Sequence, residues 1–184
     1  NETIIEEAKK PEGSLKLPVV LQRAEVENQN SRIYPKQILF REAKKYEELI
    51  KENRALGELD HPESTVVNLA NVSHAIKEQQ FDGNVLKGVI EILPTPAGDI
   101  AKKLIAAGVK LGISSRGIGS VKENEVEQNI VQDDFNLIAY DIVSNPSTPG
   151  AFIGESISYE QKKVNKSNKI NKEINKILMT RLGE

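Results

Sequence analysis

The sequence predicts an α+β domain in which helices flank a mainly antiparallel sheet or barrel. Most of the chain consists of segments rich in branched apolar residues, which favour extended strands. Two segments instead repeat their apolar residues at the three- and four-residue spacing of an amphipathic helix. Strands and helices do not alternate regularly and no internal repeat is present, so a parallel α/β sheet and a repeat protein are not expected.

The first half of the domain is predicted to run strand, turn, helix and loop. Residues 15–26 (LKLPVVLQRAEV) are rich in branched apolar side chains and are expected to form a strand. Pro35 suits the first turn of a helix, because the N–H that proline lacks is not needed there. The helix is expected to run to about Ala55, with Gly57 just past its end and a loop over residues 57–63.

The second half is predicted to be largely extended. Residues 65–78 continue as a strand, and the Asp82-Gly83 pair indicates a hairpin turn between two extended runs. A short helix is expected over residues 99–110. Two further strands are expected at residues 111–121 and 129–145.

The composition divides the chain into one domain with two flanking segments. Residues 1–13 are polar and are expected to form a loosely held N-terminal arm, and residues 14–154 form the domain proper. Residues 155–184 form a tail rich in lysine and asparagine. One narrow apolar stripe in this tail suits a helix that needs a partner surface, and it comprises Ile170, Ile174, Ile177 and Leu178.

The composition also excludes several kinds of chemistry. The chain has no cysteine, so disulfides, a thiolate nucleophile and Cys-ligated zinc are all absent. Its 25 basic and 27 acidic residues give a formal net charge of −2, which indicates neither a nucleic-acid nor a membrane partner. No bilayer-spanning apolar run, secretory leader or recognised metal-ligand spacing is present. We therefore expect a soluble intracellular protein without cofactor or metal.

The stretch GISSRGIGS, residues 112–120, combines two adjacent serines with an arginine and three glycines. On a strand, alternate residues face opposite sides. The face that carries Ile113 and Ser115 is the more apolar and is expected to point into the core. Ser114 and Arg116 then lie together on the other face, so Ser114 is the better candidate to meet a histidine base.

Two other interpretations of this stretch stay open on the residues alone. A phosphate-binding loop would need the pattern GxxxxGK[ST] between a strand and a helix, whereas Lys122 is misplaced and the glycines lie in a predicted strand. Small residues can also serve only to let two strands approach closely. Without further information, this last role is the commoner one.

A catalytic serine needs a base, and the chain has only two histidines. His61 follows Asp60 in a loop after a helix, where functional side chains are common, although most such histidines are simply on the surface. His74 lies in a predicted strand and is expected to face solvent or a neighbour. Asp141 interrupts an apolar strand, so it either faces solvent or is paired. The alternative acids are Asp60, Glu58, Asp133 and Asp134.

Four stretches together resemble the prohead core (capsid maturation) proteases of large tailed bacteriophages, which are related in fold to the herpesvirus assembly proteases. They are QRAEVENQNSRIYPKQIL, ALGELDHPE, GISSRGIGSV and AYDIVSNPSTPGA, in the family's order. They cover roughly residues 20–153. Each stretch alone is a weak match, but the combination is specific.

The resemblance implies a serine endopeptidase with a herpesvirus-protease-like fold that digests the internal scaffold and trims capsid proteins. The family's histidine falls on His61, its nucleophile on Ser114 and its third member on Asp141. In the herpesvirus relatives a second histidine takes the third role. The backbone around Arg116 and Gly117 is the candidate oxyanion hole.

The resemblance also implies cleavage after glutamate in an Ile/Leu-x-Glu motif, inside the prohead in the host cytoplasm. Either Arg116 or Lys122 could present a cation to the glutamate. The C-terminal Leu182-Gly183-Glu184 fits the motif, which suggests self-processing. Further implications are scaffold, core and capsid proteins as substrates, and a homo-oligomer. The alternatives are a non-catalytic capsid or scaffold assembly protein of the same fold and another acyl hydrolase.

Overall fold

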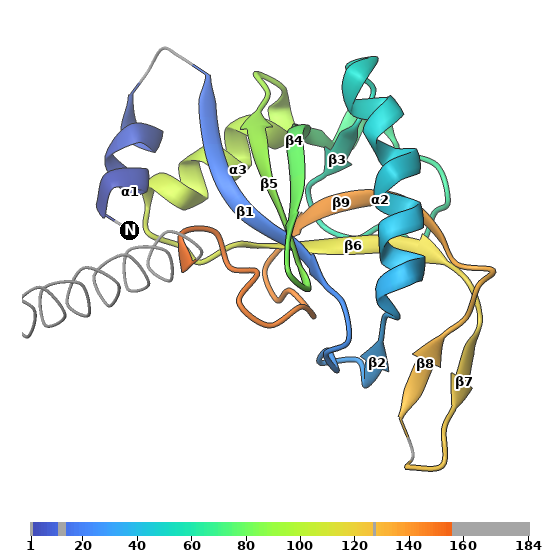
Figure 1. Ribbon diagram of the computed structural model, residues 1–184. Coiled ribbons are helices and arrows are strands. Elements are labelled where there is room, and N and C mark those ends of the chain that lie inside the picture. The colour runs from blue at the N-terminus through green and yellow to red at the C-terminus, as the bar shows by residue number, and fades with distance from the viewer. Residues whose placement is uncertain (1, 11–13, 127, 156–184) are drawn as a thin grey trace, which may run out of the picture.

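The computed structural model describes residues 2–10, 14–126 and 128–155. It confirms the α+β class, with three α-helices and nine strands in these residues (Figure 1). Apart from Glu155, the predicted tail over residues 155–184 lies outside the described residues, and so does the proposed processing site at Glu184. No helix in the described part of the chain is long and apolar enough to cross a membrane.

The largest sheet has four antiparallel strands in the order β1-β5-β4-β3. The strands are β1 (Leu15–Arg23), β3 (Leu56–Glu58), β4 (Val72–Asp82) and β5 (Val85–Ile92). The predicted Asp82-Gly83 turn joins β4 to β5, and Gly83 has the positive φ of 63° that such turns favour. The segment from residue 65 does not continue directly as strand, because a 3₁₀ turn over Leu69–Asn71 precedes β4.

β6 (Gly112–Ile118) and β9 (Asn136–Val143) form a separate two-stranded antiparallel sheet. This pair contacts β1 and β3, and one isolated parallel bridge between Leu59 and Ile142 joins it to the end of β3. A single bridge does not extend the hydrogen-bonded ladder. The strands in the described ranges therefore do not close into the barrel that the sequence suggested.

The third sheet is small and lies beside the β6–β9 pair. It contains β2 (Arg32–Ile33), β7 (Val121–Glu123) and β8 (Asn129–Val131). β2 is parallel to β8, and β8 is antiparallel to β7. Figure 1 shows β7 and β8 projecting from the body of the molecule.

The two predicted helices are present, with shifted ends. α2 (Lys36–Lys51) stops before residue 55, because the chain turns at Asn53, where φ is 55°. α3 (Pro96–Ala106) begins three residues earlier than expected. The Thr95 side chain caps this helix by accepting a hydrogen bond from the Gly98 N–H at 3.0 Å.

The N-terminal residues form a helix that the sequence interpretation missed. α1 (Glu2–Lys9) packs against α3, with Ile4 and Ala8 buried. These two residues are four apart and so lie on one face of the helix. Residues 2–9 are therefore not the loosely held arm that their polarity suggested, whereas the domain boundary at residue 13 stays a prediction.

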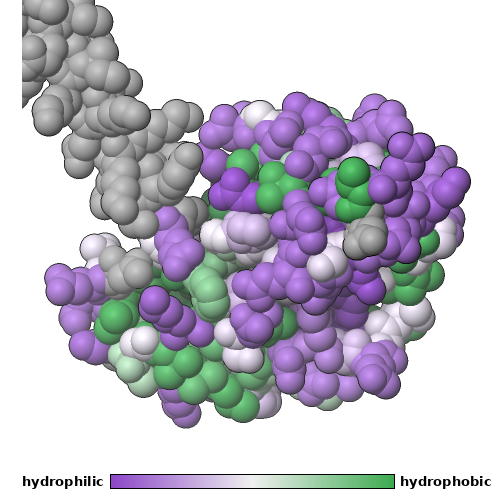
Figure 2. Space-filling view, turned by 90° about the horizontal axis from the view of Figure 1, so that it is seen from below, coloured by the Kyte–Doolittle hydropathy of each residue, from purple (hydrophilic) through white to green (hydrophobic). Residues whose placement is uncertain are grey.

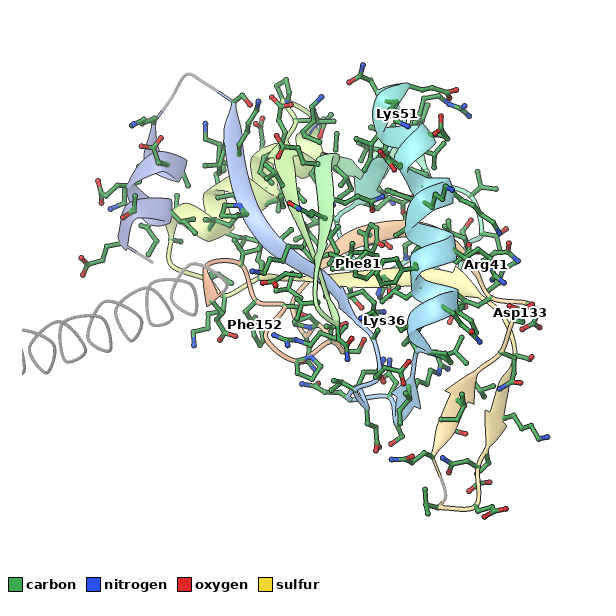
Figure 3. All side chains as sticks on the ribbon, viewed as in Figure 1. Lys36, Arg41, Lys51, Phe81, Asp133 and Phe152 are labelled. Atoms are coloured by element: carbon green, nitrogen blue, oxygen red, sulfur yellow. The ribbon has the colours of Figure 1, made fainter. Side chains whose placement is uncertain are left out.

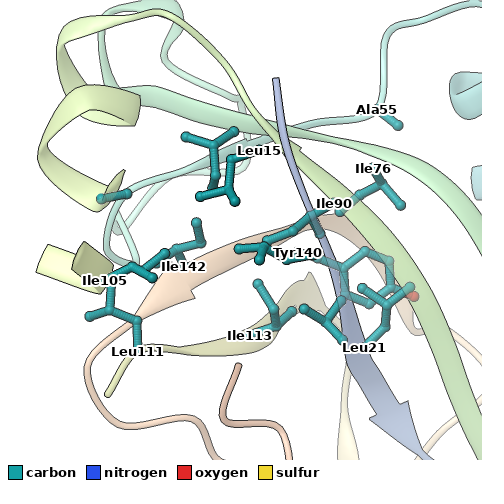
Figure 4. Close-up of a cluster of buried hydrophobic side chains, with 14 of the residues drawn as sticks. Leu15, Leu21, Ala55, Ile76, Ile90, Ile105, Leu111, Ile113, Tyr140 and Ile142 are labelled. Atoms are coloured by element: carbon teal, nitrogen blue, oxygen red, sulfur yellow. The ribbon is translucent and has the colours of Figure 1, made fainter. Parts of the chain in front are cut away.

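The main core is aliphatic, as the low aromatic content predicts, and lies between the large sheet, the β6–β9 pair and helices α1, α2 and α3. Figure 4 shows the side chains that meet there, among them Leu21, Ile90, Ile113 and Ile142. Tyr140 is fully buried, and its ring meets Tyr46 edge to face at a centroid distance of 5.1 Å. The face seen in Figure 2 is mostly hydrophilic, with hydrophobic residues in separate groups.

Candidate active site

The β6–β9 pair brings the candidate nucleophile and the candidate acid together. Ser114 and Asp141 are directly opposite each other in the antiparallel register. Side chains opposite each other in such a pair lie on the same face of the sheet. Both are buried, with exposed fractions of 4% for Ser114 and 0% for Asp141. Of the two alternatives for Asp141, a carboxylate facing solvent is therefore wrong, and a buried, paired carboxylate is confirmed.

The adjacent Ser115 points the other way and has a different task. Its Oγ accepts a hydrogen bond from Gln22 Nε2 at 2.6 Å. Gln22 Oε1 in turn accepts a hydrogen bond from Thr148 Oγ1 at 2.5 Å, which ties β1 to the segment after β9. This arrangement agrees with the strand alternation that favoured Ser114 as the residue that can meet His61.

His61 lies in the loop after β3, and its imidazole reaches Asp141. The chain turns sharply at Asp60, which has a φ of 71° and whose N–H donates to the Ile142 carbonyl at 2.7 Å. This turn directs the next residue toward β9. His61 Nδ1 lies 2.8 Å from Asp141 Oδ2, although the two residues are 80 positions apart in the chain.

The Asp141 carboxylate is ionised and anchored. Burial by itself would raise the pKa of Asp141, but the hydrogen bonds from His61, the Glu58 N–H and Arg116 outweigh burial and lower the pKa below its ordinary value. A carboxylate that accepts from His61 Nδ1 requires the proton to be on Nδ1. In the neutral ring with this tautomer, His61 Nε2 has a free lone pair, as a general base needs.

The alternative acids do not contact the imidazole. Asp133 is exposed and pairs with Arg41 of α2 at 2.5 Å (Figure 3). Asp134 accepts hydrogen bonds from the N–H and hydroxyl of Ser120. The Asp60 carboxylate accepts from the backbone N–H of its neighbour, and Glu58 contacts Arg116.

His61 and Ser114 line one cavity of about 790 Å³. Ser114 Oγ makes a long hydrogen bond of 3.5 Å with Ser147 Oγ, and among the described residues no hydrogen bond joins Ser114 to His61. Catalytic hydrogen bonds are often long without substrate and tighten when it binds. The described residues of the cavity wall include Arg32, Tyr34, Arg116, Gly117 and Asn145, and none of them carries a carboxylate.

Arg116 and Gly117 lie beside Ser114 on β6, but the side chain of Arg116 faces Asp141. Its Nε and Nη2 donate to the two oxygens of Asp141 at 2.8 and 3.3 Å. At Gly117, a Cβ atom would lie 2.5 Å from the Phe135 ring. This glycine therefore allows close packing, which supports the structural role weighed for the stretch. The glycine-rich residues form a strand and not a loop that opens a helix, which argues against phosphate binding.

His74 was expected to face solvent or a neighbour, and it is fully buried. Burial lowers its pKa to about 4, although nearby Asp141 and a hydrogen bond to Tyr140 act in the opposite direction. The neutral ring donates through Nε2 to the Tyr140 carbonyl at 3.0 Å, and Ser73 Oγ donates to Nδ1 at 2.9 Å. His74 thus supports the residue before Asp141. The signal for its burial was slight, because only Ala75 and Ile76 follow His74 before the polar residues 77–80.

Comparison with known sequences identifies the family. Residues 6–167 match the family described as "Prohead core protein serine protease". The chain is 35% identical over 138 residues to the prohead core protein protease of Enterobacteria phage T4. That match covers 73% of this chain and 65% of the relative, so the chain spans about two thirds of the relative's length.

Comparison with solved structures agrees. The fold is similar to that of the bacteriophage T4 capsid assembly protease, with a TM-score of 0.69 and 31% identity. The similarity covers 73% of this chain and 85% of that one. On the family match, the sequence relative and the shared fold, this chain belongs to the prohead core serine protease family.

Proposed function

We propose that this chain is a serine endopeptidase in which Ser114 is the nucleophile, His61 the general base and Asp141 the residue that orients it. One observation carries this proposal. The His61–Asp141 hydrogen bond of 2.8 Å adjoins Ser114 across the β6–β9 register, at a cavity that both His61 and Ser114 line. Family membership supplies the reaction class.

The proposed mechanism follows from this geometry. His61 Nε2 removes the proton from Ser114 Oγ as the oxygen attacks the scissile carbonyl carbon. The C–O bond forms, and the carbonyl electron pair moves to the oxyanion. Asp141 keeps its charge and stabilises the imidazolium. The proton then passes to the leaving amine and the C–N bond breaks. Water next attacks the acyl carbon while His61 takes its proton, the C–Oγ bond breaks, and the proton returns to Ser114 Oγ.

Backbone N–H groups near Ser114 are the proposed oxyanion donors. The Ile113 N–H donates to the Ala151 carbonyl, on the strand edge away from β9. Because N–H groups two residues apart on a strand point to the same edge, Ser115 directs its N–H away from β9 and Arg116 directs its N–H toward β9, and the register with β9 shifts between Arg116 and Gly117. The N–H of Arg116 therefore faces the partner strand, and Gly117 is the better of the two candidate donors.

We also propose cleavage after glutamate, with Arg32 as the cation that meets it. The Arg116 guanidinium is already paired with Asp141, and Lys122 lines a different cavity. Arg32 lines the cavity with Ser114, and among the described residues its side chain bonds the Tyr34 side chain and pairs with no carboxylate. Among the described residues the cavity wall carries no acid, so Arg32 offers an anionic substrate side chain an attractive partner there.

The proposed substrates are scaffold, core and capsid proteins, cut inside the prohead in the host cytoplasm by a homo-oligomer. The family description supports the prohead as the place and core proteins as substrates, and the homo-oligomer and the host cytoplasm are proposed on the resemblance alone. Self-processing is proposed only at exposed motifs. Leu56-Gly57-Glu58 is an unsuitable site in the folded chain, because Glu58 is fully buried.

Peptide cleavage tests the proposal. The purified chain is incubated with a peptide that contains one Ile-x-Glu site, beside Ser114→Ala and the matched control Ser115→Ala. We expect cleavage after Glu by the parent and Ser115→Ala, and a loss of kcat of about 10⁴-fold or more in Ser114→Ala. Replacing Arg32 by Gln should raise KM for the Glu peptide more than for its Gln analogue. Equal cleavage by parent and Ser114→Ala would refute the nucleophile assignment.

A non-catalytic assembly role is the second candidate. The observation in its favour is the absence, among the described residues, of a hydrogen bond between Ser114 and His61. It predicts that parent and Ser114→Ala are equally inert toward the peptide and bind scaffold protein with the same affinity.

A further inference from the structure

Three buried charged side chains lie behind His61, and the proposed mechanism uses only Asp141. The other two are Arg116, with an exposed fraction of 8%, and Glu58, with 0%. We propose that Arg116 is a positioning residue that acts through Asp141 to fix His61 in the tautomer with its proton on Nδ1, with Glu58 as its counter-ion. This inference rests on the proposed catalytic role of His61.

The first argument is the number of donors around Asp141. Oδ1 accepts from the Glu58 N–H at 3.0 Å and from Arg116 Nη2 at 3.3 Å. Oδ2 lies 2.8 Å from His61 Nδ1 and 2.8 Å from Arg116 Nε. An ionised carboxylate has about four acceptor positions, and here all four are used. The carboxylate therefore cannot rotate without breaking several hydrogen bonds, and His61 Nδ1 meets an acceptor in one fixed direction.

The second argument is that Arg116 also holds the loop that carries His61. Arg116 Nη1 donates to the Ser64 carbonyl at 2.7 Å, across 52 positions of the chain. Glu58, at the start of this loop, lies 3.6 Å from Arg116 Nη2 and accepts a hydrogen bond from the Asn68 N–H. One guanidinium thus connects the acid on β9 with both halves of the loop over residues 59–71.

The third argument concerns charge. Arg116 contributes one positive charge against the two negative charges of Glu58 and Asp141, all withdrawn from water. Without the cation, two carboxylates would be buried close together, which favours protonation of one of them. A protonated Asp141 would offer a donor where His61 Nδ1–H needs an acceptor. The planar fork of arginine is required for this geometry, since lysine supplies only a point charge.

The histidine tautomers can be measured directly, because the chain contains only His61 and His74. His74 donates through Nε2, so it provides an internal reference of the opposite tautomer. We would label both rings with ¹⁵N and record long-range ¹H–¹⁵N spectra above the ordinary histidine titration range. His61→Gln assigns the two rings.

Two variants and one control separate positioning from folding. Arg116→Lys keeps the charge and loses the fork. The double variant Arg116→Gln/Glu58→Gln removes one charge of each sign, so the cluster keeps its net charge of −1. Arg41→Lys is the matched control, because Arg41 also bonds a buried carboxylate, Glu42, far from His61 in the chain. Circular dichroism establishes that each variant is folded.

We expect the parent and Arg41→Lys to show His61 with its proton on Nδ1, and both site variants to show a mixture of tautomers. In the peptide assay, kcat of the site variants should fall about 10–100-fold with KM changed less than about two-fold. An unchanged His61 tautomer in both folded site variants would overturn the inference. If the parent is inert but the tautomer shift appears, the proposed protease activity fails while the positioning role stands.

Discussion

At the residue scale, the two histidines show how burial decides chemistry. His61 is in a cavity wall and bonds a carboxylate, whereas His74 is enclosed between β3 and β9 and bonds a backbone carbonyl. The sequence distinguished them only by their neighbours. It could place Ser114 by strand alternation and His61 by its loop, but it left Asp141 as one of several acids. The contact that distinguishes Asp141 from the other acids joins residues 80 positions apart.

His74 should make the stability of the protein depend on pH. Its folded-state pKa is about 4, below the 6.5 of an exposed imidazole, so the unfolded chain takes up the proton first as the pH falls. The stabilisation is present above pH 6.5 and is lost progressively as the pH falls to about 4. The loss amounts to about 3 kcal/mol.

Urea unfolding of the parent and of His74→Gln across this pH range measures the effect. The difference between the two unfolding free energies should shrink as the pH falls from 6.5 to 4. The pKa of Asp141 is lowered, so its own contribution is lost only at more acidic pH. If the unfolding free energies of the parent and of His74→Gln changed in parallel with pH, the pKa of His74 would be the same in the folded and the unfolded protein, which would contradict this prediction.

At the element scale, the site depends on how closely β3 approaches β9. A Cβ atom on Gly57 would lie 2.1 Å from the Tyr140 carbonyl and 2.3 Å from His74 Cε1. Only glycine permits this approach. The sequence predicted α2 and the β4–β5 hairpin from local spacing and turn residues. It placed Gly57 in a loop, because the partner strand β9 is far along the chain.

Replacing Gly57 by Ala should therefore destabilise the fold by about 3 kcal/mol, since neither the carbonyl nor the buried ring can move away. Gly83→Ala is the matched control. At Gly83 no atom lies within 4 Å of the added Cβ, and only the positive φ of 63° is unfavourable, at a cost of about 1 kcal/mol. Chemical denaturation compares the two, and an equal loss would show that β3 can shift away from β9.

At the scale of the whole molecule, the class of fold was predictable and the closure of the sheets was not. The local spacing of apolar residues predicts the individual strands and helices, and the order of these elements predicts an α+β domain. Whether the β6–β9 pair joins the four-stranded sheet depends on long-range packing, and in the described residues a single β-bridge, between Leu59 and Ile142, connects the pair to the end of β3. The network around Arg116 was equally hidden, because it joins residues from β3, β6, β9 and the His61 loop.

The most direct test of the catalytic assembly is a covalent adduct at Ser114. A fluorophosphonate loses fluoride when an activated serine oxygen attacks its phosphorus, while the serine proton passes to the histidine base. Mass spectrometry of the digested protein then locates the adduct. We predict modification of Ser114 and not of Ser115, abolished in His61→Ala and in Asp141→Ala variants that remain folded. Modification of Ser115, or of Ser114 at the parent rate in His61→Ala, would contradict the assignment of this triad.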